Sequence, residues 1–401
     1  MQDPVRVYSF PRWRITRWLA DAGPSVPEDI RADLVANLFG TLPVFVGGVM
    51  NTLIVSAAIA VRQPTPLFLA WLILEITICI ARMLVLITAR QAALKRRKTP
   101  TDIYLLLGIA WSASVGYGVV ISMASGDWVA ATLAGSSAAA MVGGICFRNF
   151  SAPRLVATMI VLSLGPSVPG ALLGGEPLLF VVFAQVPVYL AAMTLAAFKL
   201  NKMLVATMRA ERENDYRAQH DALTGLSNRA GLAHAVNSRL AAGPDVALAL
   251  LFLDLDGFKI VNDTFGHGGG DRLLKMVAER LSRMLRAVDV GARVGGDEFV
   301  VLAEALTPER AAAFGEALIA SVANGYDLGE GVSASIGVSI GIAMAPEHGS
   351  DLTQLLAVAD AALYEAKSGG KSRCCMASAI TNLAALRRLQ GPATDRFGAA
   401  A

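Results

Sequence analysis

Six apolar stretches in the first half of this 401-residue chain limit its fold more than any other feature. They lie near residues 39–61, 66–89, 103–124, 127–147, 154–174 and 176–199. Each approaches the roughly 20 residues that carry a helix across a bilayer. Only 17% of the residues are charged, whereas soluble globular proteins carry about a quarter. The sequence therefore predicts an all-α polytopic membrane region of six helices over 39–199, which we interpret as sensory.

Charges in the connecting loops predict the orientation of these helices. Lysines and arginines gather before the first stretch, after the second, after the fourth and at the end of the sixth, whereas the alternate loops hold only Arg62. By the positive-inside rule, both termini then face the cytoplasm. Residues 1–38 are polar and lack the apolar core of a cleaved signal peptide, so we interpret them as a cytoplasmic arm.

Three features of the membrane half have more than one interpretation. Glu75 and Arg82 lie two helical turns apart on one face, so they form an ion pair, or Arg82 extends to the cytoplasmic surface, or they bind a ligand. The segment "PRWRITRWLA" is either a basic helix on the inner leaflet, in contact with membrane lipid, or a disordered arm. The four cysteines form no CxxC or Cys/His pattern and are interpreted as reduced apolar residues.

Residues 200–220 contain good helix formers and neither glycine nor proline, so we expect the sixth helix to continue as a connecting helix. Leu200, Leu204 and Thr207/Met208 share one face of that helix and suit a short two-stranded coiled coil. A plain spacer helix is the alternative. The net charge of only +3, without a basic stripe bearing aromatics, argues against nucleic acid as a partner.

The pattern changes after residue 220 to alternating helices and strands. Helices are expected near 227–241, 268–287, 308–323 and 351–368. The near-continuous apolar run "DVALALLFLDLDGF" is typical of a central buried strand, "ARVGGDEFVVL" reads as a hairpin, and "SASIGVSIGIA" reads as another strand. Such alternation predicts a soluble α/β sandwich, in which helices back a sheet.

Carboxylates occur where apolar strands end. Asp297 and Glu298 follow the glycine pair Gly295-Gly296, and Asp254 ends the central strand. Adjacent like charges repel each other, and a cation relieves that repulsion. Mg²⁺ prefers oxygen ligands and keeps positions for water and phosphate. The pattern therefore predicts a magnesium cluster, whereas the four hairpin residues alone would fit an exposed acidic turn.

Four motifs in order resemble the GGDEF family of diguanylate cyclases over about residues 217–375. They are "DALTGLSNR" (221–229), "DLDGFKIVNDTFGHGGGD" (254–271), "RVGGDEF" (293–299) and "ADAALYEAKSGGK" (359–371). The resemblance implies a GGDEF domain over 221–375 with the palm fold of nucleotidyl cyclases. Residues 376–401 lie beyond it, and we expect a short helix and a loose tail there.

The resemblance also implies roles for individual residues. Mg²⁺, with Mn²⁺ as an alternative ion, would be held by Asp254, Asp297 and the carbonyl of Leu255. Glu298 would be a further ligand or would help to deprotonate the attacking hydroxyl. Asn262 and Asp271 would read the guanine edge. The remaining substrate contacts would come from a phenylalanine, two turn glycines and three lysines that neutralise the triphosphate: Phe258, Gly295, Gly296, Lys259, Lys367 and Lys371.

The implied reaction condenses two GTP molecules into cyclic di-GMP and two pyrophosphates across a homodimer, in which each domain holds one GTP. The enzyme would lie in the bacterial cytoplasmic (inner) membrane. "RAVD" (286–289) matches the family's inhibitory product site, in which Arg286 and Asp289 would hold a guanine of cyclic di-GMP; an ordinary ion pair is the alternative. The next helix offers only Arg310 as the second arginine often found in the family.

Two other functions compete with the cyclase. A catalytically silent cyclic di-GMP receptor usually carries a degraded signature, whereas Asp254, Asp297 and Glu298 are all present here. A transporter would need a repeat of broken helices, which the six stretches lack. Departures from the family are few: Gly257 replaces a frequent aromatic residue, and Lys371 stands where arginine is common.

Overall fold

The computed structural model describes residues 7–40, 42–241, 243, 247–329 and 332–378. The chain divides into two compact units, Met1–Glu211 and Arg212–Ala401. The short helix expected after residue 376 lies outside the described residues, as do the first six residues of the expected N-terminal arm.

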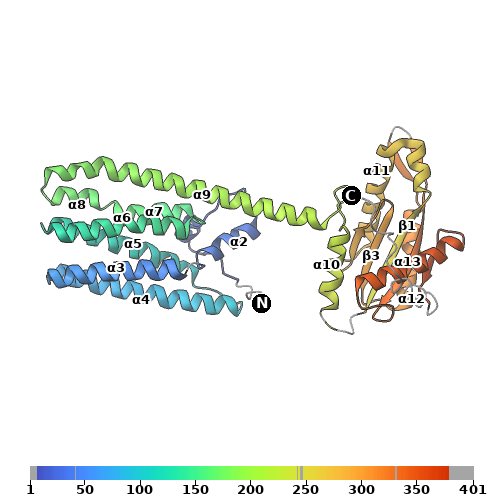
Figure 1. Cartoon of the computed structure of the whole chain (residues 1–401), viewed down its shortest axis with the longest axis horizontal. Coiled ribbons are helices and arrows are strands. Elements are labelled where there is room, and N and C mark those ends of the chain that lie inside the picture. Colours follow the sequence, from blue (N-terminus) through green and yellow to red (C-terminus); the bar gives the residue numbers. More distant parts are fainter. Residues whose placement is uncertain (1–6, 41, 242, 244–246, 330–331, 379–401) are drawn as a thin grey trace, which may run out of the picture. The chain divides into compact units, whose positions relative to one another are not determined.

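The first unit is entirely helical, and Figure 1 shows its long helices lying side by side as a bundle. Six segments are long and apolar enough to cross a membrane, which confirms the six predicted stretches. The elements are α1 (Arg14–Leu19), α2 (Glu28–Asn37), α3 (Leu42–Arg62), α4 (Pro66–Leu94), α5 (Thr101–Ala124), α6 (Trp128–Asn149), α7 (Pro153–Leu164), α8 (Ser167–Leu173), the 3₁₀ turn Pro177–Val181 and α9 (Val182–Gln219).

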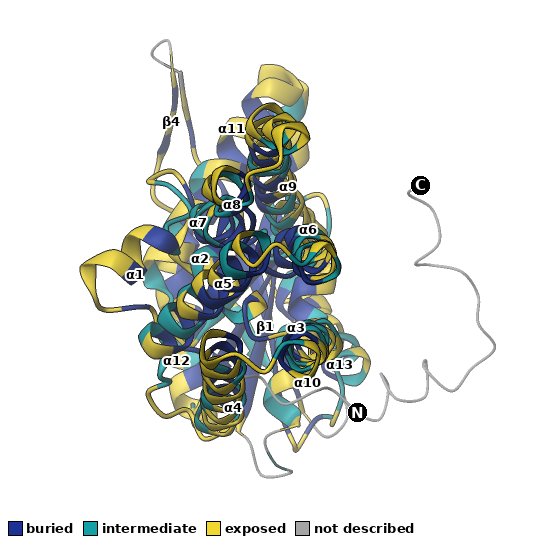
Figure 2. Ribbon diagram, turned by 90° about the vertical axis from the view of Figure 1, so that its left-hand side faces the viewer, coloured by how far each residue is buried: buried dark blue, intermediate teal, exposed yellow. Residues whose placement is uncertain are grey.

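Small residues allow these helices to approach one another closely. A Cβ atom on Gly116 of α5 would lie 2.1 Å from the carbonyl oxygen of Leu162 and 2.7 Å from Cγ of Pro166. The α5 backbone therefore packs directly against the break between α7 and α8, as small residues permit in membrane bundles. Large apolar residues of α4 such as Ile73 and Leu84 are exposed, and Figure 2 shows exposed residues of this helix in yellow.

The N-terminal segment is folded against the bundle over its described part. The backbone N–H groups of Arg12 and Trp13 donate to Oδ1 of Asp102, at 2.9 and 3.1 Å, and α1 follows immediately. The disordered-arm interpretation is therefore wrong for these residues. Trp13, Ile15 and Trp18 point outward and are more than half exposed.

The second unit is built on a five-stranded sheet of order β2-β3-β1-β6-β7. The apolar run 248–256 forms the central strand, as predicted, and pairs antiparallel with β3 and β6. Among the strands that the structure describes, β6 and β7 form the one parallel pair. The strands are β1 (Leu248–Asp256), β2 (Val290–Arg293), β3 (Glu298–Glu304), β6 (Gly337–Ala345) and β7 (Cys374–Met376), with a separate hairpin of β4 (Tyr326–Gly329) and β5 (Val332–Ala334).

Helices cover both faces of this sheet, which confirms the α/β sandwich (Figure 1). One core contains Leu251 and Leu253 of β1 with side chains of α11 (Phe258–Met284) and α12 (Pro308–Val322). The other contains Leu250 with side chains of α10 (Arg229–Leu240) and α13 (Leu352–Ser368). Alternate residues of one strand thus serve two cores, which explains its continuous apolar sequence.

One helix differs from its prediction. We expected a helix to begin near 268, but α11 begins at Phe258, directly after β1. Gly257 adopts φ +89°, a left-handed conformation that L side chains rarely accept, and Gly266 interrupts the helix with φ +69°. The glycines between 257 and 270 led us to predict no helix between the central strand and residue 268. The structure has a helix there, and it is kinked at Gly266.

Candidate active site

Strand register brings the predicted carboxylates together. Asp254 on β1 lies directly opposite Glu298 on β3 in the antiparallel pair. The backbone N–H of Leu255 donates to the carbonyl oxygen of Asp297 at 3.2 Å, which fixes the turn against the end of β1. Residues from two distant motifs of the sequence therefore form one site at the edge of the hairpin.

The carboxylates experience an environment that disfavours their charges. Burial raises the pKa of Glu298, and the nearby charges of Asp254 and Asp297 raise it further. Burial also raises the pKa of Asp254, although Lys367 acts in the opposite direction. Nζ of Lys367 lies 2.6 Å from Oδ2 of Asp254. Asp360 adds a further negative charge near Glu298, so the ammonium group of Lys367 faces an excess of carboxylates.

The donor set fits a hard divalent cation. Within the described part of the chain, no group of three or more His, Cys, Asp or Glu side chains is arranged as a preformed metal site. The predicted set of Asp254, Asp297 and the main-chain carbonyl of Leu255 supplies only oxygen atoms, which Mg²⁺ accepts alongside water and phosphate. Burial and the repulsion among these carboxylates, which together raise the pKa of Glu298, would both be relieved by a bound cation.

The glycine turn is shaped by its neighbours. A Cβ atom on Gly295 would lie 2.3 Å from Oε2 of Glu298, so any side chain there would displace the carboxylate. Gly296 has open space around its Cα. Its carbonyl oxygen accepts hydrogen bonds from Nε and Nη2 of Arg293, at 3.1 and 2.9 Å. Nη1 of Arg293 also donates to both carboxylate oxygens of Asp221, at 3.1 and 3.2 Å.

The role of Arg293 and Asp221 was missed in the sequence. Both residues lie inside the quoted motifs, but they are 72 positions apart and nothing in their spacing announces a contact. In the structure, Arg293 joins the motif that opens the domain to the turn that carries Asp297. Burial opposes the ionisation of Asp221, but hydrogen bonds from Thr224 and Arg293 hold its pKa below the usual value.

The predicted guanine readers lie on either side of the kink in α11. A Cβ atom on Gly270 would lie 1.9 Å from Oδ1 of Asn262 and 3.2 Å from Cζ of Phe258. The side chains of Asn262 and Phe258 therefore converge on the residue next to Asp271, which is exposed. The kink at Gly266 folds the two halves of this motif so that Asn262 meets Gly270.

The predicted phosphate lysines occupy three different settings. Lys259 is exposed in the first turn of α11, and Lys367 is paired with Asp254. Lys371 lies exposed in the loop after α13 with φ +66°. That loop is anchored by Asp256, whose carboxylate accepts from the backbone N–H of Ser372 at 3.1 Å and from the hydroxyl of Ser339. Asp256 thus positions Lys371, a role that the sequence did not reveal.

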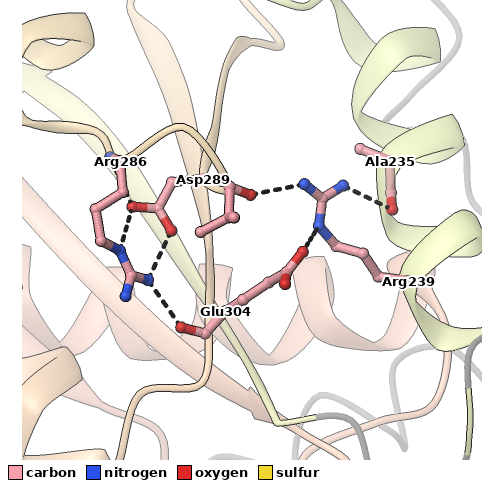
Figure 3. Close-up of polar contacts among 6 residues, drawn as sticks. Ala235, Arg239, Arg286, Asp289 and Glu304 are labelled. Atoms are coloured by element: carbon pink, nitrogen blue, oxygen red, sulfur yellow. Dashed lines mark hydrogen bonds and ion pairs between the residues drawn. The ribbon is translucent and has the colours of Figure 1, made fainter.

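The Arg286–Asp289 pair forms a compact unit, drawn in Figure 3. Nε and Nη2 of Arg286 donate to the two carboxylate oxygens of Asp289, at 2.9 and 2.7 Å. The Asp289 side chain is only 1% exposed, whereas half of Arg286 is exposed. Burial opposes the ionisation of Asp289, but hydrogen bonds from Arg286 hold its pKa below the usual value.

A second arginine lies beside this pair, and it comes from an unexpected helix. Arg239 of α10 forms an ion pair with Glu304 and donates from Nη2 to the carbonyl oxygen of Val288 at 2.7 Å (Figure 3). Arg286 donates to the backbone carbonyl of the same Glu304 at 2.8 Å. The sequence had offered only Arg310 for this position.

The central antiparallel sheet, the two helical layers and the carboxylates at the β1–β3 edge define a nucleotidyl-cyclase-like fold. Residues 218–373 match the family model described as "Diguanylate cyclase, GGDEF domain". The second unit of this chain is a GGDEF domain, and six candidate membrane-spanning helices precede it.

Known proteins resemble this part of the chain. It is 43% identical over 184 residues to the bifunctional diguanylate cyclase/cyclic di-GMP phosphodiesterase MucR of Pseudomonas aeruginosa, covering 45% of this chain and 27% of MucR. It is 41% identical over 155 residues to the diguanylate cyclase TpbB of the same species, covering 38% of this chain and 36% of TpbB. The chain thus matches about a quarter to a third of the length of these relatives.

A solved structure of the isolated GGDEF domain of TpbB from P. aeruginosa is 38% identical. The match covers 43% of this chain and 99% of that one, with a TM-score of 0.38.

Proposed function

We propose that this chain is a membrane-bound diguanylate cyclase that condenses two GTP molecules into cyclic di-GMP and two pyrophosphates. The observation that carries the proposal is the intact set of carboxylates at the β1–β3 edge, with Asp254 opposite Glu298 and Asp297 in the adjoining turn. The family match over residues 218–373 supports the same reaction.

In the proposed reaction, the 3′-oxygen of one GTP forms a bond to the α-phosphorus of the other, and the bond from that phosphorus to pyrophosphate breaks. Mg²⁺ held by Asp254, Asp297 and the Leu255 carbonyl would stabilise the charge that develops on the phosphate oxygens. Glu298 takes the hydroxyl proton or completes the metal site. Its raised pKa makes it a stronger base than an ordinary carboxylate.

The remaining residues hold the substrate. Asp271 would accept hydrogen bonds from the guanine edge, and the amide of Asn262 would donate to it or accept from it, next to the ring of Phe258. Lys259, Lys367 and Lys371 would neutralise the triphosphate, and Lys367 would have to leave its contact with Asp254 to do so. Gly295 and Gly296 leave the backbone open to the nucleotide.

The reaction requires two domains, because each GTP attacks the other. A homodimer would meet this need, and α9 supports it as a single helix that continues from the last candidate span to Gln219. In this proposal the bundle lies in the bacterial inner membrane, and the positive loops favour a cytoplasmic position for both termini and the GGDEF domain.

Product inhibition would act through Arg286 and Asp289. Because both Asp289 oxygens accept from Arg286, cyclic di-GMP must draw the arginine outward before a guanine edge reaches the aspartate. The half-exposed guanidinium is the part of the pair that a ligand meets first.

Product analysis tests the proposed function. The detergent-purified full chain is incubated with GTP and Mg²⁺, and nucleotides are identified by mass spectrometry beside Asp297→Ala. Asp327→Asn is the matched control, because Asp327 is exposed on β4, outside the site. Formation of cyclic di-GMP by the wild type and by Asp327→Asn, but not by Asp297→Ala, supports the cyclase. Absence of product from folded, dimeric, GTP-binding protein freed of bound product favours the receptor instead.

A further inference from the structure

Two buried arginines in the membrane unit carry charge that no described carboxylate contacts. Arg82 of α4 and Arg148 of α6 are only 6% and 7% exposed. Arginine stays ionised in proteins, and a charge inside a bilayer is costly unless it is paired. No ion pair joins either arginine to a carboxylate among the described residues.

Both guanidinium groups lie against the same aromatic ring. Their central carbons are 4.9 Å (Arg82) and 4.7 Å (Arg148) from the ring centroid of Phe45 on α3. Arg82 also lies 4.4 Å from the ring centroid of Trp111 on α5. The aromatic faces attract each cation but do not relieve the repulsion between the two like charges.

Hydrogen-bond donors on both groups lack acceptors. Within the described chain, the buried Nε of Arg82 has no partner. Nη2 of Arg148 donates to the carbonyl oxygen of Leu38 at 3.2 Å and to the hydroxyl of Tyr104, but its buried Nε also has no partner. Unsatisfied charged donors of this kind are rare in folded interiors.

The two simpler explanations of Arg82 do not hold. Its side chain is buried against aromatic rings and does not extend to the surface. Glu75, two turns away on the same helix, is fully buried and attracts Arg82 electrostatically, but the two are not in ion-pair contact and the Nε–H of Arg82 stays unpartnered. A ligand that accepts from this N–H is the interpretation that we pursue.

The geometry points to a binding site for a phosphate group between Arg82 and Arg148. The Nε edge of a guanidinium presents two parallel N–H donors that match two oxygens of an oxyanion. Arg82 offers this edge, and Arg148 adds its unpartnered Nε–H, because its Nη2 already donates to Leu38 and Tyr104. Together these donors need more acceptor oxygens than one carboxylate offers, whereas a phosphate carries them on a single phosphorus atom. Phosphate charge would also neutralise both arginines at once.

The depth of the site agrees with this ligand. Phe45 lies in the first turn of α3, Tyr104 in the first turn of α5, and Arg148 is the penultimate residue of α6. These helix ends lie on the side that the positive loops assign to the cytoplasm, close to where lipid phosphates begin. The phosphate could therefore belong to an inner-leaflet lipid or to a free ion. Its occupancy would join four helices, independently of any cyclase activity.

Tryptophan fluorescence offers a specific readout, because all five tryptophans (Trp13, Trp18, Trp71, Trp111 and Trp128) belong to the membrane unit. Thermal unfolding of the delipidated full chain is followed with sodium phosphate, against sodium chloride of equal ionic strength. The same chain in phosphatidylglycerol and phosphatidylcholine nanodiscs tests the lipid source, and native mass spectrometry counts retained phospholipids.

Saturable stabilisation by phosphate identifies a free ion, and retention of phospholipid that free phosphate does not displace identifies a lipid. Arg82→Gln and Arg148→Gln should each weaken the interaction at least roughly tenfold, because each removes a positive charge and at least one charge-assisted hydrogen bond. Arg82→Lys keeps the positive charge but loses the paired N–H donors of the guanidinium. Its phosphate affinity should therefore lie between those of the wild type and Arg82→Gln. Arg97→Gln, at an exposed loop position, should match the wild type.

The wild type alone can overturn the inference if a variant fails to fold. If wild-type protein shows no saturable stabilisation by phosphate and also retains no phospholipid, the site is excluded. Equal effects in the wild type and both glutamine variants would attribute any stabilisation to the general membrane surface.

Discussion

Glu298→Gln should stabilise the GGDEF domain at neutral pH while it abolishes or strongly reduces cyclase activity. The substitution preserves the size of the side chain and removes one of three neighbouring negative charges. Burial and the charges of Asp254 and Asp297 raise the pKa of Glu298, so the folded domain disfavours the ionised form. Glutamine has no such form.

The direction of the change in folding stability with pH follows from proton linkage. The folded state holds the Glu298 proton more tightly than the unfolded chain, so wild-type stability falls as pH rises from the ordinary glutamate range through the raised pKa. The loss is complete once the pH exceeds the raised pKa and is absent at acidic pH, where the carboxyl is protonated in both states. The advantage of the glutamine variant should therefore appear only as pH rises through that window.

The magnitude follows from the strand register. Asp254 and Glu298 are directly opposite on β1 and β3, and like charges in that position cost between about 0.2 and 1 kcal/mol. Both side chains are partly solvated, which favours the lower part of that range. Amide protons of β1 and β3 should then exchange about 1.4- to 5-fold more slowly in the variant at neutral pH.

Hydrogen-exchange mass spectrometry of the full chain provides the assay, with wild type and variant compared at each pH so that intrinsic exchange rates cancel. Peptides from the membrane unit serve as the internal control. Addition of Mg²⁺ should reduce or reverse the difference, because the cation neutralises the wild-type cluster. Faster exchange in the glutamine variant at neutral pH without Mg²⁺ would refute the reasoning, since Glu298 would then be a stabilising partner.

Three further substitutions separate the parts of the site. Arg293→Ala frees the carbonyl of Gly296, and we expect turnover to fall about tenfold to hundredfold through misplaced carboxylates, measured as kcat with the protein still folded by circular dichroism. Gly295→Ala places a methyl group on the Glu298 carboxylate, so the Mg²⁺ concentration for half-maximal activity should rise. Arg286→Ala should raise the cyclic di-GMP concentration for half-inhibition at least roughly tenfold, and an unchanged value would remove the product site.

Periodicity and hydropathy carry the sequence prediction a long way here. The six apolar stretches became six candidate spans, because each is long enough to identify without knowledge of its neighbours. The run 248–256 could be assigned to the centre of a sheet because its residues are apolar on both faces. The carboxylates could be grouped because they end strands, where polar side chains reach solvent and ligands.

The missed features depend on backbone conformation and on distant contacts. The early start of α11 was hidden because glycines normally end helices, whereas here Gly257 and Gly266 adopt left-handed φ values that permit a start and a kink. Gly257, which looked like a departure from the family, thus meets a backbone requirement. Arg239 could not be placed near Arg286, because α10 reaches that edge only through the packing of the sheet.

Asp256 shows how the same residue type can take different roles two positions apart. Asp254 and Asp256 lie on the same side of β1, yet only Asp254 meets Glu298 and Lys367. Asp256 accepts instead from Ser339 and Ser372 and anchors the loop after α13. Sequence spacing predicts which face each carboxylate occupies but not which partner awaits it there.

The end of α9 reaches the glycine turn through a short series of hydrogen bonds within the C-terminal unit. The N–H of Asn228 donates to the carbonyl of Gln219 at 2.8 Å, and the N–H of Arg293 donates to the carbonyl of Ser227 at 2.8 Å. Arg293 then holds Gly296, next to Asp297. Arg293 therefore joins the end of α9 to the turn that carries Asp297 by a continuous series of hydrogen bonds. If the chain is a cyclase as proposed, a displacement of the helix end has a direct route to the carboxylates, and Arg293→Ala should interrupt it.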